Sequence, residues 1–203
     1  MLKALELFEI GIKRVRNIDS IYAHLTTNLG FSSQDISDLL RTEIVYCVSS
    51  FDRFIHDIVN FAMVETFKNN RTPTNAYKNF NITLSQFESI NKATIPPAEH
   101  IFSETVISSH KHLSFQDPSK VVEALSLIWL ESHKWQKIAL TMSMNENDVK
   151  TELKNIVIRR NQIVHEGDFD LLTGSMQLIT HSDTLESVNF IENLGKAIYN
   201  LVK

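Results

Sequence analysis

The chain has 203 residues, of which 43% are hydrophobic and 22% charged, so it can bury a sizeable core and is not intrinsically disordered. Only 5 glycines and 4 prolines occur, which favours long helices over a fold rich in strands and turns. The single cysteine, Cys47, excludes an internal disulfide and a zinc site built from cysteines. The net charge of −4 excludes a basic protein that coats nucleic acid, so any RNA contact must be local.

The N-terminal segment lacks the uninterrupted apolar stretch of a signal peptide, because charged residues occur throughout residues 1–16. No segment approaches the ~18 consecutive apolar residues that a membrane span needs. We therefore expect a cytoplasmic protein without a membrane partner. With no internal repeat or linker in the sequence, we also expect one domain over residues 1–203.

The first part of the chain is predicted to form two amphipathic helices. Apolar residues spaced by three and four predict one from about residue 2 to 24, which the run ending at Gly30 stops. The second, from about residue 34 to 68, is expected to be the longest. Its apolar residues form two stripes on nearly opposite sides: Ile36, Leu40, Cys47, Phe51, Phe54, Ile58 and Phe61 in one, and Val45, Val48, Val59 and Met63 in the other. Such a helix lies either in the middle of a bundle or between a core and a partner subunit.

The middle of the chain is predicted to be a loop followed by shorter helices. Polar residues and proline predict the loop, and the helices follow from apolar spacing and from start signals such as Asp117-Pro118-Ser119. The expected loop is 69–79, and the expected helices are 85–92, 98–112, 121–130 and 135–142.

The last part of the chain should contain two longer helices. Asn145, together with Asp148, is expected to cap a helix at about residues 146–166, and Gly167 ends it. Residues 169–180 read as a small hairpin or an ordered loop. Asp183-Thr184-Leu185-Glu186 resembles a capping box for a final helix. The predicted fold is therefore an all-α bundle with one long central helix.

Three charged residues occupy positions where a hydrophobic residue is expected. Arg160 falls in the middle of the apolar stripe of helix 146–166, while Glu43 and Asp52 fall within the two stripes of the long helix. A buried charge is costly unless it is paired. The commonest explanation for such a set is a buried structural salt bridge.

His165 adds a second interpretation, in which these residues carry chemistry. On an ideal helix it lies about 140° from Arg160 but only about 40° from Asn161, so Asn161 and His165 share a rim beside the arginine. An arginine can hold a phosphate and a histidine can move a proton near neutral pH. Because the 2′-hydroxyl of RNA can attack its own phosphate, this pair is a minimal set for RNA cleavage without a metal or a protein nucleophile.

Arg160 and His165, with four residues between them and a polar residue after the arginine, resemble the signature of the HEPN superfamily. The run Ile-Arg-Arg-Asn-Gln-Ile-Val-His-Glu-Gly-Asp at residues 158–168 is similar to the RiboL-PSP-HEPN family in particular. So are two upstream segments, 43–57 and 114–120, the latter reading Ser-Phe-Gln-Asp-Pro-Ser-Lys. The matched segments span most of the chain.

The resemblance implies an up-down helical bundle that dimerises, so that arginines and histidines of two subunits meet in one cleft. It also implies metal-independent endoribonuclease activity on an RNA substrate, in a bacterial defence or toxin–antitoxin setting with a possible antitoxin or effector partner. The alternative is a non-catalytic module that binds a partner protein, nucleotide or RNA through the same cleft. Neither alternative requires a cofactor.

Within the enzyme interpretation each candidate residue has an expected role. Arg160 would bind the phosphate, His165 would be the general acid or base, and Asn161 would orient the histidine or the substrate. The remaining candidates are three supporting residues near the cleft, Glu43, Asp52 and His56, and two that would approach RNA phosphates, Lys154 and Arg159. A solvated helix face explains the last two equally well.

A metal site is the other chemical alternative around the motif. Six residues of types that bind metals flank one loop: His165, Glu166, Asp168, Asp170, His181 and Asp183. Their spacing matches no established metal motif, and acidic residues after a helix are usually only solvated. We therefore expect no metal ligand among them.

Overall fold

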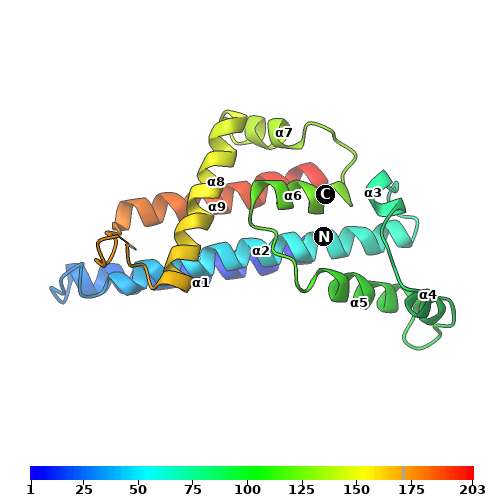
Figure 1. Ribbon diagram of the computed structural model, residues 1–203, viewed down its shortest axis with the longest axis horizontal. Coiled ribbons are helices and arrows are strands. Elements are labelled where there is room, and N and C mark those ends of the chain that lie inside the picture. The colour runs from blue at the N-terminus through cyan, green and yellow to red at the C-terminus, as the bar shows by residue number, and fades with distance from the viewer. Residues whose placement is uncertain (171) are drawn as a thin grey trace.

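The computed structural model describes residues 1–170 and 172–203, and its longest helix forms the axis of an elongated helical bundle (Figure 1). This helix, α2 (Ser37–Phe67), runs beside α1 (Leu2–Thr27), and α9 (His181–Val202) packs on both of them. The motif helix, α8 (Glu146–Glu166), packs on α2 and crosses it at a steep angle (Figure 1). The all-α prediction is therefore confirmed, as is the central place of the long helix.

The remaining helices are shorter and cover the other sides of α2. Both α5 (Ala98–His110) and α6 (Pro118–Ser126) pack on α2, and α7 (Lys134–Thr141) packs on α8 and α9. The short helices α3 (Asn75–Lys78) and α4 (Leu84–Asn91) lie toward one end of the bundle (Figure 1). Over the described residues the only β-type pairing is an isolated bridge between Phe169 and Met176.

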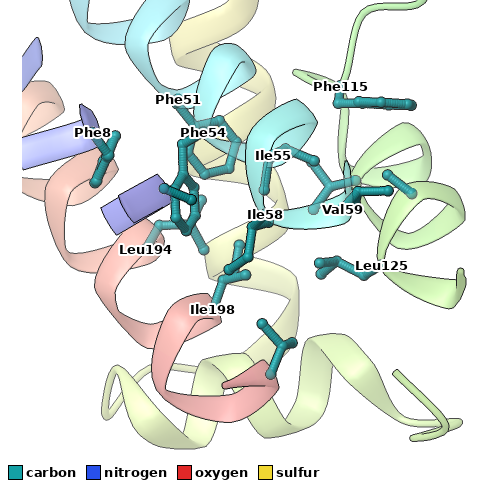
Figure 2. Close-up of a cluster of buried hydrophobic side chains, with 14 of the residues drawn as sticks. Phe8, Phe51, Phe54, Ile55, Ile58, Val59, Phe115, Leu125, Leu194 and Ile198 are labelled. Carbon is teal, nitrogen blue, oxygen red and sulfur yellow. The ribbon is translucent and has the colours of Figure 1, made fainter. Parts of the chain in front are cut away.

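Most residues of both apolar stripes of α2 are buried in the core, because helices cover it on several sides. Figure 2 shows the α2 side chains between Phe8 of α1, Leu194 and Ile198 of α9, and Leu125 of α6. Val48 and Val59 of the second stripe are completely buried. A helix that is apolar on two sides lies either in the middle of a bundle or against a partner subunit. For Val48 and Val59 the structure shows the first of these, a place in the middle of the bundle.

Local capping chemistry sets several of the helix boundaries. The Thr83 hydroxyl and the Gln86 side chain form a reciprocal capping box at the start of α4, while Asp117 caps α6. Gly167 ends α8 in the left-handed conformation, with φ of +62°, which a glycine adopts without steric cost. The predicted bounds of α8 are confirmed at both ends.

Three boundary predictions are wrong. The last helix begins at His181, because the Thr180 hydroxyl accepts the Asp183 amide and caps it, and the predicted capping box at 183–186 lies inside the helix. Helix α6 ends at Ser126 rather than near residue 130. The predicted loop at 69–79 contains the single turn of α3, which Thr74 caps.

The segment predicted as a hairpin or ordered loop, 169–180, is held by backbone hydrogen bonds. The Asp170 amide donates to the Ser175 carbonyl and the Gln177 amide donates to the Asp168 carbonyl, each at 2.8 Å. Leu171, which belongs to the predicted segment, lies outside the described residues. Among the helices described here, none has the length and apolar character required to cross a bilayer.

Candidate functional site

The motif residues lie on the C-terminal half of α8, where Asn161 and His165 are exposed and Arg160 is partly buried. The Arg160 guanidinium donates one hydrogen bond, from Nη1 to Asn161 Oδ1 at 3.0 Å. Its Nε is buried without a hydrogen-bond partner among the described residues. No carboxylate of the described residues lies within ion-pair distance of Arg160. Its charge is therefore not compensated by a structural salt bridge.

The neighbouring Arg159 has the opposite environment. Its Nη1 lies 2.8 Å from Asp168 Oδ1, and its Nη2 donates to Asp168 Oδ2 at 2.9 Å. It also donates to the Gln177 side chain at 2.6 Å and to the Leu178 carbonyl at 3.0 Å. Arg159, expected to contact RNA phosphates, is therefore occupied by internal partners, because the buried Asp168 carboxylate requires compensation.

Arg41 of α2 completes this arrangement. Its Nε donates to Asp168 Oδ2 at 2.6 Å, and its Nη2 donates to the Gln177 carbonyl at 2.8 Å. We call Arg41, Arg159, Asp168 and Gln177 the Asp168 cluster. Arg41 was not selected in the sequence analysis. Arg41 lies four residues before Val45, on the second apolar stripe of α2, and a charged residue on an apolar stripe is the signal that selected Arg160.

Glu43 is fully buried, and neither of its carboxylate oxygens has a hydrogen-bond partner among the described residues. The pKa of Glu43 is raised from 4.5 to about 7, chiefly by burial and also by the nearby Asp19 carboxylate, while Arg16 opposes the rise. Both of these charged neighbours belong to α1. The expected pairing of Glu43 with Arg160 is therefore absent, and burial shifts the ionisation of Glu43 toward the uncharged carboxyl.

Asp52 and His56 bind the chain segment between α5 and α6. Asp52 Oδ1 accepts the Phe115 amide at 2.6 Å, and His56 Nε2 lies 3.3 Å from the Leu113 carbonyl. The His56 ring also packs on the Phe115 ring, with centroids 4.5 Å apart. Neither side chain reaches Arg160 in these contacts. Both side chains therefore hold residues 113–115, and their supporting role near the cleft stays a prediction.

Lys154 is exposed on α8 and lines a surface groove of about 560 Å³. The groove also contains Lys150 and Trp135, and the Trp135 indole donates to the Pro118 carbonyl at 3.1 Å. Lys150 forms an ion pair with Glu146. On an ideal helix Lys154 and His165 lie about 20° apart and are separated by roughly 16 Å along the axis, so they share one face of α8.

Two of the residues considered as metal ligands are bound to other side chains. Asp168 is enclosed by the two arginines, and His181 Nε2 lies 2.6 Å from Asp19 Oδ1. Over residues 1–170 and 172–203, no group of three or more His, Cys, Asp or Glu side chains is arranged to hold a metal ion.

Exposed apolar side chains surround the motif. They lie on the last turns of α8 and on the segment that follows it, and they comprise Ile158, Val164, Phe169, Leu172, Met176 and Leu178. Large exposed apolar side chains on neighbouring segments are suited to contact with another protein.

The comparisons with known proteins identify one family. The model of the RiboL-PSP-HEPN family matches residues 10–203, which includes the motif helix and both upstream segments noted in the sequence. No curated protein sequence and no solved structure gives a significant match.

Proposed function

Because the chain belongs to the RiboL-PSP-HEPN family, we propose that it is a metal-independent endoribonuclease whose chemistry depends on Arg160, Asn161 and His165. One observation carries the proposal. Arg160 has no carboxylate partner among the described residues, whereas the adjacent Arg159 forms an ion pair with Asp168. A partly buried guanidinium without an anion is suited to bind one, and an RNA phosphate provides it.

The reaction divides between the two charged residues of the motif. Arg160 binds the scissile phosphate and stabilises the negative charge that develops on its oxygens. A histidine removes the proton of the 2′-hydroxyl, whose oxygen attacks the phosphorus while the bond to the 5′-oxygen breaks. The leaving 5′-oxygen takes a proton, so the products are a 2′,3′-cyclic phosphate and a 5′-hydroxyl. Asn161 orients the Arg160 guanidinium through the hydrogen bond that joins them.

The proposed active form is a homodimer with a shared cleft. Within one helix Arg160 and His165 diverge by about 140°, and a second subunit supplies a histidine that faces the first subunit's arginine. It also supplies a second histidine, so that one can act as base and the other as acid. The exposed apolar side chains around the motif, such as Val164 and Phe169, are suited to such an interface.

We further propose that the enzyme acts in a bacterial defence or toxin–antitoxin system, in which an antitoxin or effector protein controls it. The second candidate function is a non-catalytic module that binds a protein, nucleotide or RNA. The same exposed apolar surface favours it, because a protein partner would cover that surface without any cleavage.

The deciding experiment incubates the purified protein with total tRNA and a mixed-sequence single-stranded RNA in EDTA. The parent should cleave at least one RNA to products with 2′,3′-cyclic phosphate ends. Arg160→Ala and His165→Ala should abolish cleavage and remain folded. His100→Ala is the matched control, because His100 is an exposed helical histidine on α5. If neither RNA is cleaved, or if the motif variants cleave like the parent, the nuclease assignment is wrong.

A further inference from the structure

The residues of the Asp168 cluster come from three separate parts of the chain and meet at the end of the motif helix. Arg41 lies on α2, Arg159 on α8, and Asp168 and Gln177 in the segment after α8. Asp168 is fully buried, so its carboxylate depends entirely on the two arginines for compensation. The cluster therefore fixes the position of Asp168 relative to both helices.

Asp168 is also part of the backbone turn that contains His165. The Gly167 and Asp168 amides both donate to the Gln162 carbonyl, with a length of 3.1 Å for Asp168, and the Phe169 amide donates to the Glu166 carbonyl at 3.2 Å. These bonds close the last turn of α8 around His165. Asp168 itself has φ of +63°, a conformation that an aspartate adopts with less strain than most residues. The turn bearing the histidine is thus joined to α2 by the hydrogen bond between Arg41 and the buried Asp168 carboxylate, and by a second one that Arg41 donates to Gln177.

We propose that Asp168, held by Arg41 and Arg159, is a positioning residue that sets the place of His165 for RNA cleavage. This inference rests on the proposed nuclease function. Helix ends fray, and His165 lies in the last turn of α8, where the helix's own hydrogen bonds are incomplete. Catalysis requires a proton-transferring group to be placed within a fraction of an ångström. The Asp168 cluster holds the end of α8 in one position through the contacts of Asp168 with Arg41 and Arg159.

Asp168→Asn is the principal test, because asparagine keeps the size of the side chain and also tolerates the left-handed conformation. The charge that binds both arginines is lost, and one acceptor oxygen becomes an amide nitrogen that donates. We expect kcat to fall by about tenfold to 100-fold with a smaller change in KM, since an active site displaced by about 1 Å loses rate on this scale. The ring resonance of His165, identified by its absence in His165→Ala, should move in the two-dimensional NMR spectrum of the variant.

Glu192→Gln is the matched control. Glu192 also forms an ion pair that joins separate helices, with Arg16 at 3.1 Å, but this pair links α1 to α9. Loss of either pair lowers the melting temperature. Only loss of the Asp168 charge should change kcat and the His165 resonance, both measured well below the melting temperature of each variant.

Two milder variants keep the test decisive if Asp168→Asn does not fold. Arg41→Lys retains the positive charge but cannot donate to the Asp168 carboxylate and the Gln177 carbonyl in the same fixed geometry. Gln177→Ala removes only the side-chain acceptor of Arg159. Each should shift the His165 resonance and lower kcat to a smaller extent than Asp168→Asn. An unchanged His165 resonance in every folded variant overturns the inference. If the parent cleaves no RNA, the nuclease proposal fails, and the resonance alone then decides whether Asp168 positions His165.

Discussion

Arg159 and Arg160 are adjacent in the sequence, yet only Arg159 is bound to a carboxylate, at 2.8 Å from Asp168. Arg160 donates a single hydrogen bond to Asn161 and leaves its Nε buried without a partner among the described residues. Two successive helical residues point about 100° apart, and here that rotation separates a structural arginine from one that is available to a ligand.

The two arginines should therefore respond differently to replacement by alanine. Arg159→Ala leaves the buried Asp168 with one arginine instead of two, and the free energy of unfolding should fall by about 3 kcal/mol. Arg160→Ala should change it by about 1 kcal/mol or less, because no ion pair is broken. Urea denaturation of the two variants and the parent measures both values. Equal losses would mean that Arg160 also has a structural partner.

Glu43→Gln should alter how stability depends on pH. The pKa of Glu43 is raised to about 7 in the folded protein, from 4.5. As the pH rises from 4.5 to 7 the unfolded chain releases this proton and the folded protein retains it, so the folded state loses stability. The full loss corresponds to about 3 kcal/mol at most.

Glutamine cannot ionise, so the difference between the variant and the parent isolates Glu43 from all other groups. The variant should gain stability relative to the parent between pH 4.5 and pH 8, as measured by urea denaturation at both values. Parallel pH profiles of the two proteins would contradict the raised pKa.

Lys154→Ala should weaken RNA binding without sequence preference. Lys154 is exposed, forms no ion pair within the described residues, and shares a face of α8 with His165. Loss of one phosphate contact should reduce the slope of log affinity against log salt by about 0.7 for a single strand. Fluorescence anisotropy in a His165→Ala background measures this slope without cleavage. Lys78→Ala, on the distant α3, is the control. An unchanged slope would place the RNA path elsewhere.

Gly195→Ala should destabilise the contact between α9 and α1. A methyl group at this position would collide with the Phe8 ring, which is itself buried. Overpacking of this kind costs about 1 to 3 kcal/mol. Phe8→Leu in the same chain should reduce that cost, because the smaller side chain gives up the space. Additive losses in the double variant, measured by denaturation, would show that the two residues do not interact.

Asp52→Ala should loosen the segment between α5 and α6. The Phe115 amide would lose its acceptor, and the free energy of unfolding should fall by about 1 to 3 kcal/mol. The direct measurement is hydrogen exchange of the Phe115 amide, which should become faster than in the parent. Unchanged exchange would mean that a different acceptor holds this amide.

The sequence by itself determined which segments are helical and where the motif lies. Spacing of apolar residues marks α2 and α8, and Gly167 fixes the end of α8, because periodicity and capping are local properties. Predictions were wrong where two local signals competed. Thr180 caps the last helix, although a second capping pattern follows at residues 183–186.

Only the tertiary structure decided which charges are paired. The sequence placed Glu43, Asp52 and Arg160 alike among apolar residues, and nothing local distinguishes a buried charge with a partner from one without. Asp168 lies 127 residues from Arg41 in the sequence, and the two meet only because α8 crosses α2. That crossing gives the Asp168 carboxylate its second arginine, because an ion pair depends on distances that only the folded chain sets. Arg159 reaches the same carboxylate from the end of α8, nine residues before it, whereas Arg160 points away.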